Sequence, residues 1–200
     1  LRLGGGSDGR TNSRIGDLSP LSGLTNLTYL ALPPVSQIAD LSPLSNLTSL
    51  KRLNFDGSWN SSQVGNITDL SPLSSLTQLE ELFLLVGPID SLSPLSSLTN
   101  LRSLTLAGSY YTPDLSPLST LTNLERLTLY TDGISALSPL AGLTQLQEMW
   151  LNGGEATCTA TDALSGLTQM RILTLPTLAD STRVLDLSGI AGMPELTEFR

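Results

Sequence analysis

Leucines in this chain recur at two alternating spacings. An L-x-x-L-x-L stretch, such as the one with Leu27, Leu30 and Leu32, ends with leucines at every second position. That alternation predicts a short β-strand whose leucines all face one way. The intervening S-P-L-S-x-L text predicts a short helical or 3₁₀ turn, with Ser19 as its cap and Pro20 at its first helical position.

The strand and the turn form a unit that is repeated along nearly the whole chain. The leucine of each L-T step returns after 22 to 29 residues, and four copies read D-L-S-P-L-S-x-L-T-x-L. One unit cannot bury its leucines alone, whereas stacked units share a continuous apolar interior. We therefore expect residues 1–200 to form a single α/β solenoid domain of about eight repeats. A curved parallel sheet should form its concave face, and short helical or 3₁₀ turns its convex face. The anchor positions are Leu24, Leu47, Leu76, Leu98, Leu121, Leu143, Leu167 and Met193.

This repeated wording resembles the leucine-rich-repeat family, and it is most similar to the 22-residue class of bacterial internalins and related surface proteins. The resemblance extends from Asp17 to Phe199. It implies a non-catalytic binding module, extracellular or at a cell surface, that serves adhesion or recognition. Its partner would be a protein, or alternatively a glycan, docked on the concave face.

The chain departs from the family at one repeated position. The family usually has an Asn three residues after the last strand leucine, where the side chain bonds neighbouring backbone. None of the corresponding residues here is Asn, so we expect these turns to satisfy their backbone polar groups by another route. The positions are Val35, Ser58, Gly87, Ser109, Asp132, Gly154 and Leu178.

Residues between the strand leucines should point outward and form the partner-binding face. Most are small and polar, so the large apolar residues among them indicate an interaction surface. The charged residues would set register and association rate. The alternative is incidental exposure, or cover by a neighbouring loop. The candidate binding residues are Tyr29, Arg52, Asp56, Glu81, Phe83, Leu85, Arg126, Tyr130, Glu148 and Trp150.

Two Gly/Ser-rich loops offer a second candidate surface. Residues 56–66 carry Trp59, and residues 108–114 carry Tyr110 and Tyr111. Aromatic residues on such loops suit adaptable recognition. The alternative is that each ring folds back and fills its own loop.

The charge of the chain excludes some partner classes. It has 10 Lys and Arg against 18 Asp and Glu, for a net charge of -8. Nucleic-acid binding needs clustered cations, so we exclude that function and binding to an anionic membrane surface. No apolar run reaches the roughly 20 residues of a membrane span. No signal peptide is present and the first residue is Leu1, so we expect the chain to be part of a longer protein.

The chemistry of the chain argues against catalysis. It has no histidine, and its one cysteine, Cys158, therefore has no His partner. We expect no enzyme activity and no cofactor. The repeated aspartates at Asp17, Asp40, Asp69 and Asp114 would align in a stack and could bind Ca²⁺, but capping of each local turn explains them one at a time. We therefore predict no metal site.

A structural role is the alternative function. The repeats start and stop in mid-strand, at Leu1-Arg2-Leu3 and at 196–200, without polar caps. Open ends of a solenoid could stack end to end into a filament or a surface layer.

Overall fold

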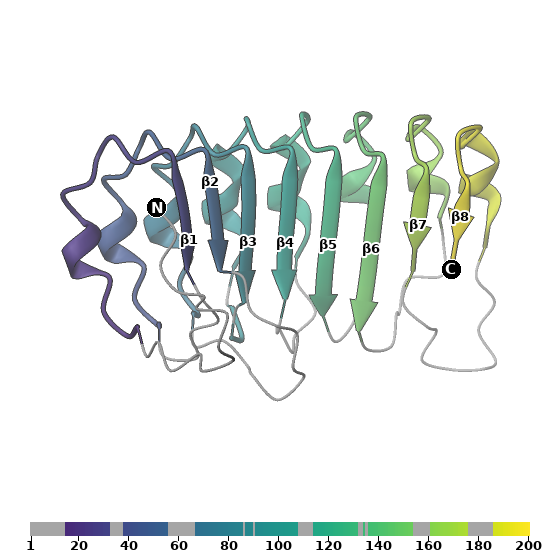
Figure 1. Cartoon of the computed structure of the whole chain (residues 1–200). Coiled ribbons are helices and arrows are strands. Elements are labelled where there is room, and N and C mark those ends of the chain that lie inside the picture. Colours follow the sequence, from purple (N-terminus) through teal and green to yellow (C-terminus); the bar gives the residue numbers. More distant parts are fainter. Residues whose placement is uncertain are drawn as a thin grey trace, which may run out of the picture.

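The repeat folds into a row of stacked rungs (Figure 1). The computed structural model describes residues 15–32, 38–55, 67–85, 87–89, 91–107, 114–131, 134, 136–153, 161–175 and 186–200. Within these residues each rung has one short strand, and the strands form one open parallel sheet in the order β1 to β8. The strands are β1 (Tyr29–Leu32), β2 (Arg52–Phe55), β3 (Glu81–Leu85), β4 (Ser103–Ala107), β5 (Arg126–Thr131), β6 (Glu148–Gly153), β7 (Ile172–Thr174) and β8 (Glu198–Phe199).

The turns lie behind the sheet (Figure 1). Every described helical segment is a 3₁₀ helix of three to five residues, so the predicted turns are confirmed. No helix in the described ranges is long and apolar enough to cross a membrane. The 3₁₀ helices are η1 (Ser19–Leu21), η2 (Ser42–Leu44), η3 (Ser71–Leu73), η4 (Ser93–Ser97), η5 (Ser116–Thr120), η6 (Ser138–Leu140), η7 (Asp162–Leu164) and η8 (Ser188–Gly192).

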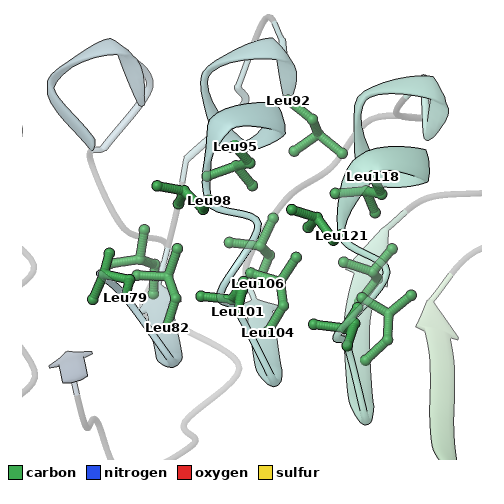
Figure 2. Close-up of a cluster of buried hydrophobic side chains, with 14 of the residues drawn as sticks. Leu79, Leu82, Leu92, Leu95, Leu98, Leu101, Leu104, Leu106, Leu118 and Leu121 are labelled. Atoms are coloured by element: carbon green, nitrogen blue, oxygen red, sulfur yellow. The ribbon is translucent and has the colours of Figure 1, made fainter. Parts of the chain in front are cut away.

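The predicted leucines form the interior. In one central rung, Leu95 and Leu98 from the turn meet Leu101, Leu104 and Leu106 from the strand side, and all point into the space between turn and sheet (Figure 2). Four of these side chains have no solvent exposure, and Leu106 is 3% exposed. Burying one such leucine contributes about 1.5–3 kcal/mol, so this interior is the main source of stability.

The outer rungs show that this burial depends on stacking. Leu24 in the first described rung is 42% exposed, whereas Leu47, its counterpart one rung later, is 0% exposed. At the other end Leu187 is 46% and Phe199 is 42% exposed, although Leu173, the residue paired with Phe199, is fully buried. The outer described rungs therefore leave some apolar residues exposed, although others, such as Leu30 and Met193, are buried there as well.

Hydroxyl and amide side chains bridge the rungs on the turn side. Ser97 Oγ donates to the carbonyl oxygen of Ser74 at 2.7 Å, and Asn100 Nδ2 donates to that of Thr77 at 2.9 Å. The same bonds recur one rung later from Thr120 and Asn123. These bonds satisfy backbone carbonyls that the strands do not use.

Of the seven positions at which the family usually has Asn, the structure describes one, Gly87. There the backbone N–H of Gly87 donates to the carbonyl oxygen of Ile67 at 2.8 Å, so the main chain itself supplies a bond between rungs. The other six positions lie outside the described residues.

The predicted cap of the turn was wrong by one step. Ser19 is the first residue of η1 rather than its cap, and Pro20 is the second. The carboxylate of Asp17 accepts the Ser19 backbone N–H at 2.8 Å and so satisfies a donor that the short helix leaves open. The Ser19 hydroxyl cannot cap the N–H of its own residue, whereas the Asp17 carboxylate, two residues earlier, reaches it.

Replacing a central leucine should destabilise the whole stack. For Leu98→Ala we expect a loss of about 2–5 kcal/mol in the free energy of unfolding, because a cavity opens among fully buried neighbours. Urea unfolding followed by circular dichroism measures this loss. The exposed Thr122→Ala is the matched control, and an equal loss in both variants would contradict the packing described above.

Candidate functional site

The outward side chains of β1 to β7 form a continuous surface, here called the strand face. Strand register places them in rows that cross the strands. The first row is Tyr29, Arg52, Glu81, Ser103, Arg126, Glu148 and Ile172. The second row is Ala31, Asn54, Phe83, Thr105, Thr128, Trp150 and Thr174.

The structure brings most of the predicted binding residues onto these rows. Tyr130 lies one step beyond the second row, where it pairs with Asn152. The side chain of Leu85 falls outside the described residues, although its backbone pairs with Ala107. Also outside the described residues are Asp56, Trp59, Tyr110, Tyr111 and Cys158.

Four aromatic side chains are the largest apolar groups described on the strand face. Tyr29 is 40% exposed, and Phe83, Tyr130 and Trp150 are half-buried. A half-buried ring still offers apolar surface that a partner can cover, and aromatic residues are frequent interface anchors. Ala31 lies in the second row as well, but its side chain is small and only 6% exposed, so it offers little surface to a partner.

Ion pairs line the edge at which the strands begin. Lys51 Nζ lies 2.9 Å from Glu80 Oε1, and Arg102 Nη1 lies 2.6 Å from Glu125 Oε1. The Lys51 ammonium lowers the pKa of Glu80 by a hydrogen bond and by its charge. Both pairs are open to solvent, which screens the attraction, so they contribute little to stability. Their main effect is to neutralise charge along this edge.

Sequence reasoning missed this row of ion pairs. Its members occupy the first x of each L-x-x-L step, and their signs alternate from Lys51 to Glu80, Arg102 and Glu125. The alternation of charge at the repeat period was the signal that could have found them.

A shallow depression of about 240 Å³ lies on the strand face over β1 to β4. Its lining includes Tyr29, Arg52, Asn54, Glu81 and Phe83. Asn54 Oδ1 is buried and accepts no hydrogen bond. The sequence placed four of these five residues among the binding candidates but did not identify Asn54, because only the packed neighbours reveal an unpartnered acceptor.

A second buried oxygen lies toward the other end of the strand face. Thr174 Oγ1 is buried without a hydrogen-bond partner, and Thr174 pairs in register with Trp150. Buried polar atoms without partners are rare in folded proteins. Two of them therefore lie in the second row, each beside a strand that carries an aromatic residue.

The repeated aspartates act on their own turns. The carboxylates of Asp40, Asp69 and Asp114 accept the backbone N–H of the serine two residues later at 2.8–2.9 Å, as Asp17 does. A hydrogen bond from the side chain of that serine, followed by the one from its backbone, lowers the pKa of all four carboxyls. In the described part of the chain no three potential metal ligands cluster.

Comparison with solved structures places the fold among bacterial repeat proteins. Internalin C2 of Listeria monocytogenes superposes with a TM-score of 0.75 at 27% identity, over 94% of this chain and 77% of that one. An internalin, InlF, of the same organism gives 0.68 at 27% identity, over 94% and 58%. A leucine-rich-repeat protein of Leptospira interrogans gives 0.62 at 19% identity, over 91% and 50%, and supports the fold alone.

These structures and the repeat together identify a leucine-rich-repeat protein with internalin-like relatives. The sequence-based resemblance is therefore confirmed. No protein-family profile and no curated protein matches the chain. The chain spans 58% and 50% of the second and third structures.

The capping aspartates should give the fold a specific acid sensitivity. A carboxyl whose pKa is lowered by folding stabilises the protein above its unfolded pKa, ordinarily 3.8, and this stabilisation is lost as pH falls through the lowered value. We expect the variant with Asn at positions 17, 40, 69 and 114 to retain the capping acceptors but to show a flatter loss of stability below about pH 5.

Urea midpoints of the wild type and the variant between pH 7 and pH 2 measure this difference. The two curves should converge at the acid end. Parallel curves over the whole range would show that the carboxylates do not contribute through their charge.

Proposed function

We propose that this chain is a non-catalytic module that docks a protein partner on its strand face, outside the cell or at its surface. The observation that carries the proposal is the set of aromatic residues on this face. Tyr29, Phe83, Tyr130 and Trp150 lie on β1, β3, β5 and β6, spaced among small polar side chains. Aromatic anchors surrounded by polar residues are typical of protein interfaces.

The dimensions of the strand face suit a protein. Seven parallel strands at about 4.8 Å span about 29 Å. A standard interface buries about 800 Å² per partner, which corresponds to a patch of similar width. A surface this broad and shallow favours a macromolecule over a small ligand, because small-molecule sites are concave and enclose most of their ligand.

The similarity to internalins supports an extracellular role. These relatives come from a bacterium and share the same repeat over 94% of this chain. Adhesion or recognition at a surface is the role that we propose for this chain. A glycan is the alternative partner, since aromatic rings and small polar groups can also hold a sugar.

Truncating two anchors should abolish binding without unfolding the protein. For Phe83→Ala and Trp150→Ala we expect a loss of about 2 kcal/mol or more each, roughly thirtyfold in affinity. A photo-crosslinking residue at Thr128, on the strand face, should form adducts with a protein on intact cells. Excess wild-type chain should compete for these adducts, and the Phe83→Ala/Trp150→Ala double variant should not.

The matched control places the crosslinker at Ser119, an exposed residue of η5 on the opposite side. Equal adduct formation from both positions would argue against docking on the strand face. So would competition by a folded double variant as strong as that of the wild type.

A second candidate function is end-to-end assembly. It is favoured by the exposed apolar side chains Leu24, Leu187 and Phe199 in the outer described rungs. Light scattering at rising protein concentration tests this assembly. An increase in molecular mass that Leu24→Glu suppresses would support it, and a protein that stays monomeric would count against it.

A further inference from the structure

The depression over β1 to β4 has the size of one side chain of a partner. Its volume is about 240 Å³, and it is open to solvent. Two aromatic residues, Tyr29 and Phe83, line it together with the polar Asn54 and Glu81. It therefore combines apolar surface for a stem with polar atoms for a head group.

Two acceptors of the depression, the Asn54 oxygen and the Glu81 carboxylate, lack a close donor within the described part of the chain. Asn54 Oδ1 is buried and receives no hydrogen bond. The carboxylate of Glu81 has its ion-pair contact with Arg52 Nε at 3.5 Å, beyond the usual 2.7–3.2 Å range of an N–H···O bond. Leaving a buried acceptor without a donor lowers stability, so a donor supplied from outside would be bound favourably.

We propose that the depression receives a lysine side chain of the docked protein, an inference that rests on the proposed function. The apolar stem would pack against the rings of Tyr29 and Phe83, which also attract a cation through their faces. The ammonium carries three donors and would pair with Glu81. A rotation of the Asn54 side chain, whose oxygen is covered in this structure, would let that oxygen accept a second hydrogen bond. The net charge of -8 favours approach of a basic partner.

Arg52 is the competitor within the chain itself. Its contact with Glu81 is long, and the two side chains are 56% and 49% exposed, so the pair is easily exchanged. The direction in which a substitution of Arg52 changes lysine binding therefore tests the proposal. Removing the Arg52 guanidinium should improve binding of an external lysine, although it removes a hydrogen-bonding group from the lining.

The probe is Nα-acetyl-lysine N-methylamide, titrated into the whole chain at low salt and followed by backbone amide chemical shifts. We expect shifts at Asn54, Glu81 and Phe83, with a dissociation constant on the order of millimolar. The norleucine analogue keeps the stem without the ammonium and should bind at least about fivefold more weakly.

Variants of the chain test each part of the depression. Glu81→Gln and Asn54→Leu should weaken binding of the lysine probe about fivefold, and Arg52→Ala should tighten it. Asn54→Leu should also raise the melting temperature by about 2–4 °C, because the unpartnered acceptor is gone. Glu148→Gln is the matched control, since it removes the same charge from the same row on β6.

Three results would overturn the lysine site: equal binding of the norleucine analogue, an equal effect of Glu148→Gln and Glu81→Gln, or weaker binding after Arg52→Ala. A melting temperature that falls in Asn54→Leu would contradict the unpartnered acceptor. If the lysine probe does not bind at the depression but crosslinking from Thr128 still occurs, only the inference of a lysine site is overturned. Loss of that crosslinking overturns docking on the strand face, whatever the probe does.

Discussion

The structure depends on one constraint: a rung cannot bury all of its leucines alone, and its neighbours complete their burial. Leu47 and Leu98 are fully buried between neighbouring rungs, whereas Leu24, the counterpart of Leu47 in the first described rung, is 42% exposed. Stability in such an array is a sum of rung and neighbour terms. Inward positions are therefore almost all apolar; the buried exception in the described part of the chain, Thr161, donates its hydroxyl to the carbonyl oxygen of Asp186. Most variation occurs at residues that point outward or lie in the turns.

Stacking of short turns also leaves backbone polar groups that side chains must satisfy. Each turn leaves backbone donors and carbonyls without partners, since 3₁₀ helices this short satisfy few of their own. The Asp40 carboxylate accepts a hydrogen bond from a backbone N–H at the start of its turn. The side chains of Ser97 and Asn100 donate to backbone carbonyl oxygens of the preceding rung. The serine and threonine content of the chain thus has a structural purpose on the turn side.

The strand face is the part that the core leaves unconstrained. Its edge is neutralised by pairs such as Lys51 with Glu80. Of its aromatic residues, Tyr29 is exposed and the others are half-buried among small polar neighbours. Two side-chain oxygens, those of Asn54 and Thr174, are buried without partners in the same row. A face that keeps such groups is less stable than an apolar one would be, which is the usual signature of a surface arranged for binding.

The sequence by itself determined the repeat, the parallel sheet and the residues that point outward, because leucine spacing at the strand period dictates which side chains are buried. It also named Phe83, Glu81 and Trp150 as surface candidates. The shift of the turn cap from Ser19 to Asp17 is local, since the two residues are only two positions apart. Only the tertiary structure decided that Ala31 is covered although it lies in an outward row, and that a depression forms around Asn54. Those two features depend on contacts between residues 20 or more positions apart, which the linear pattern does not encode.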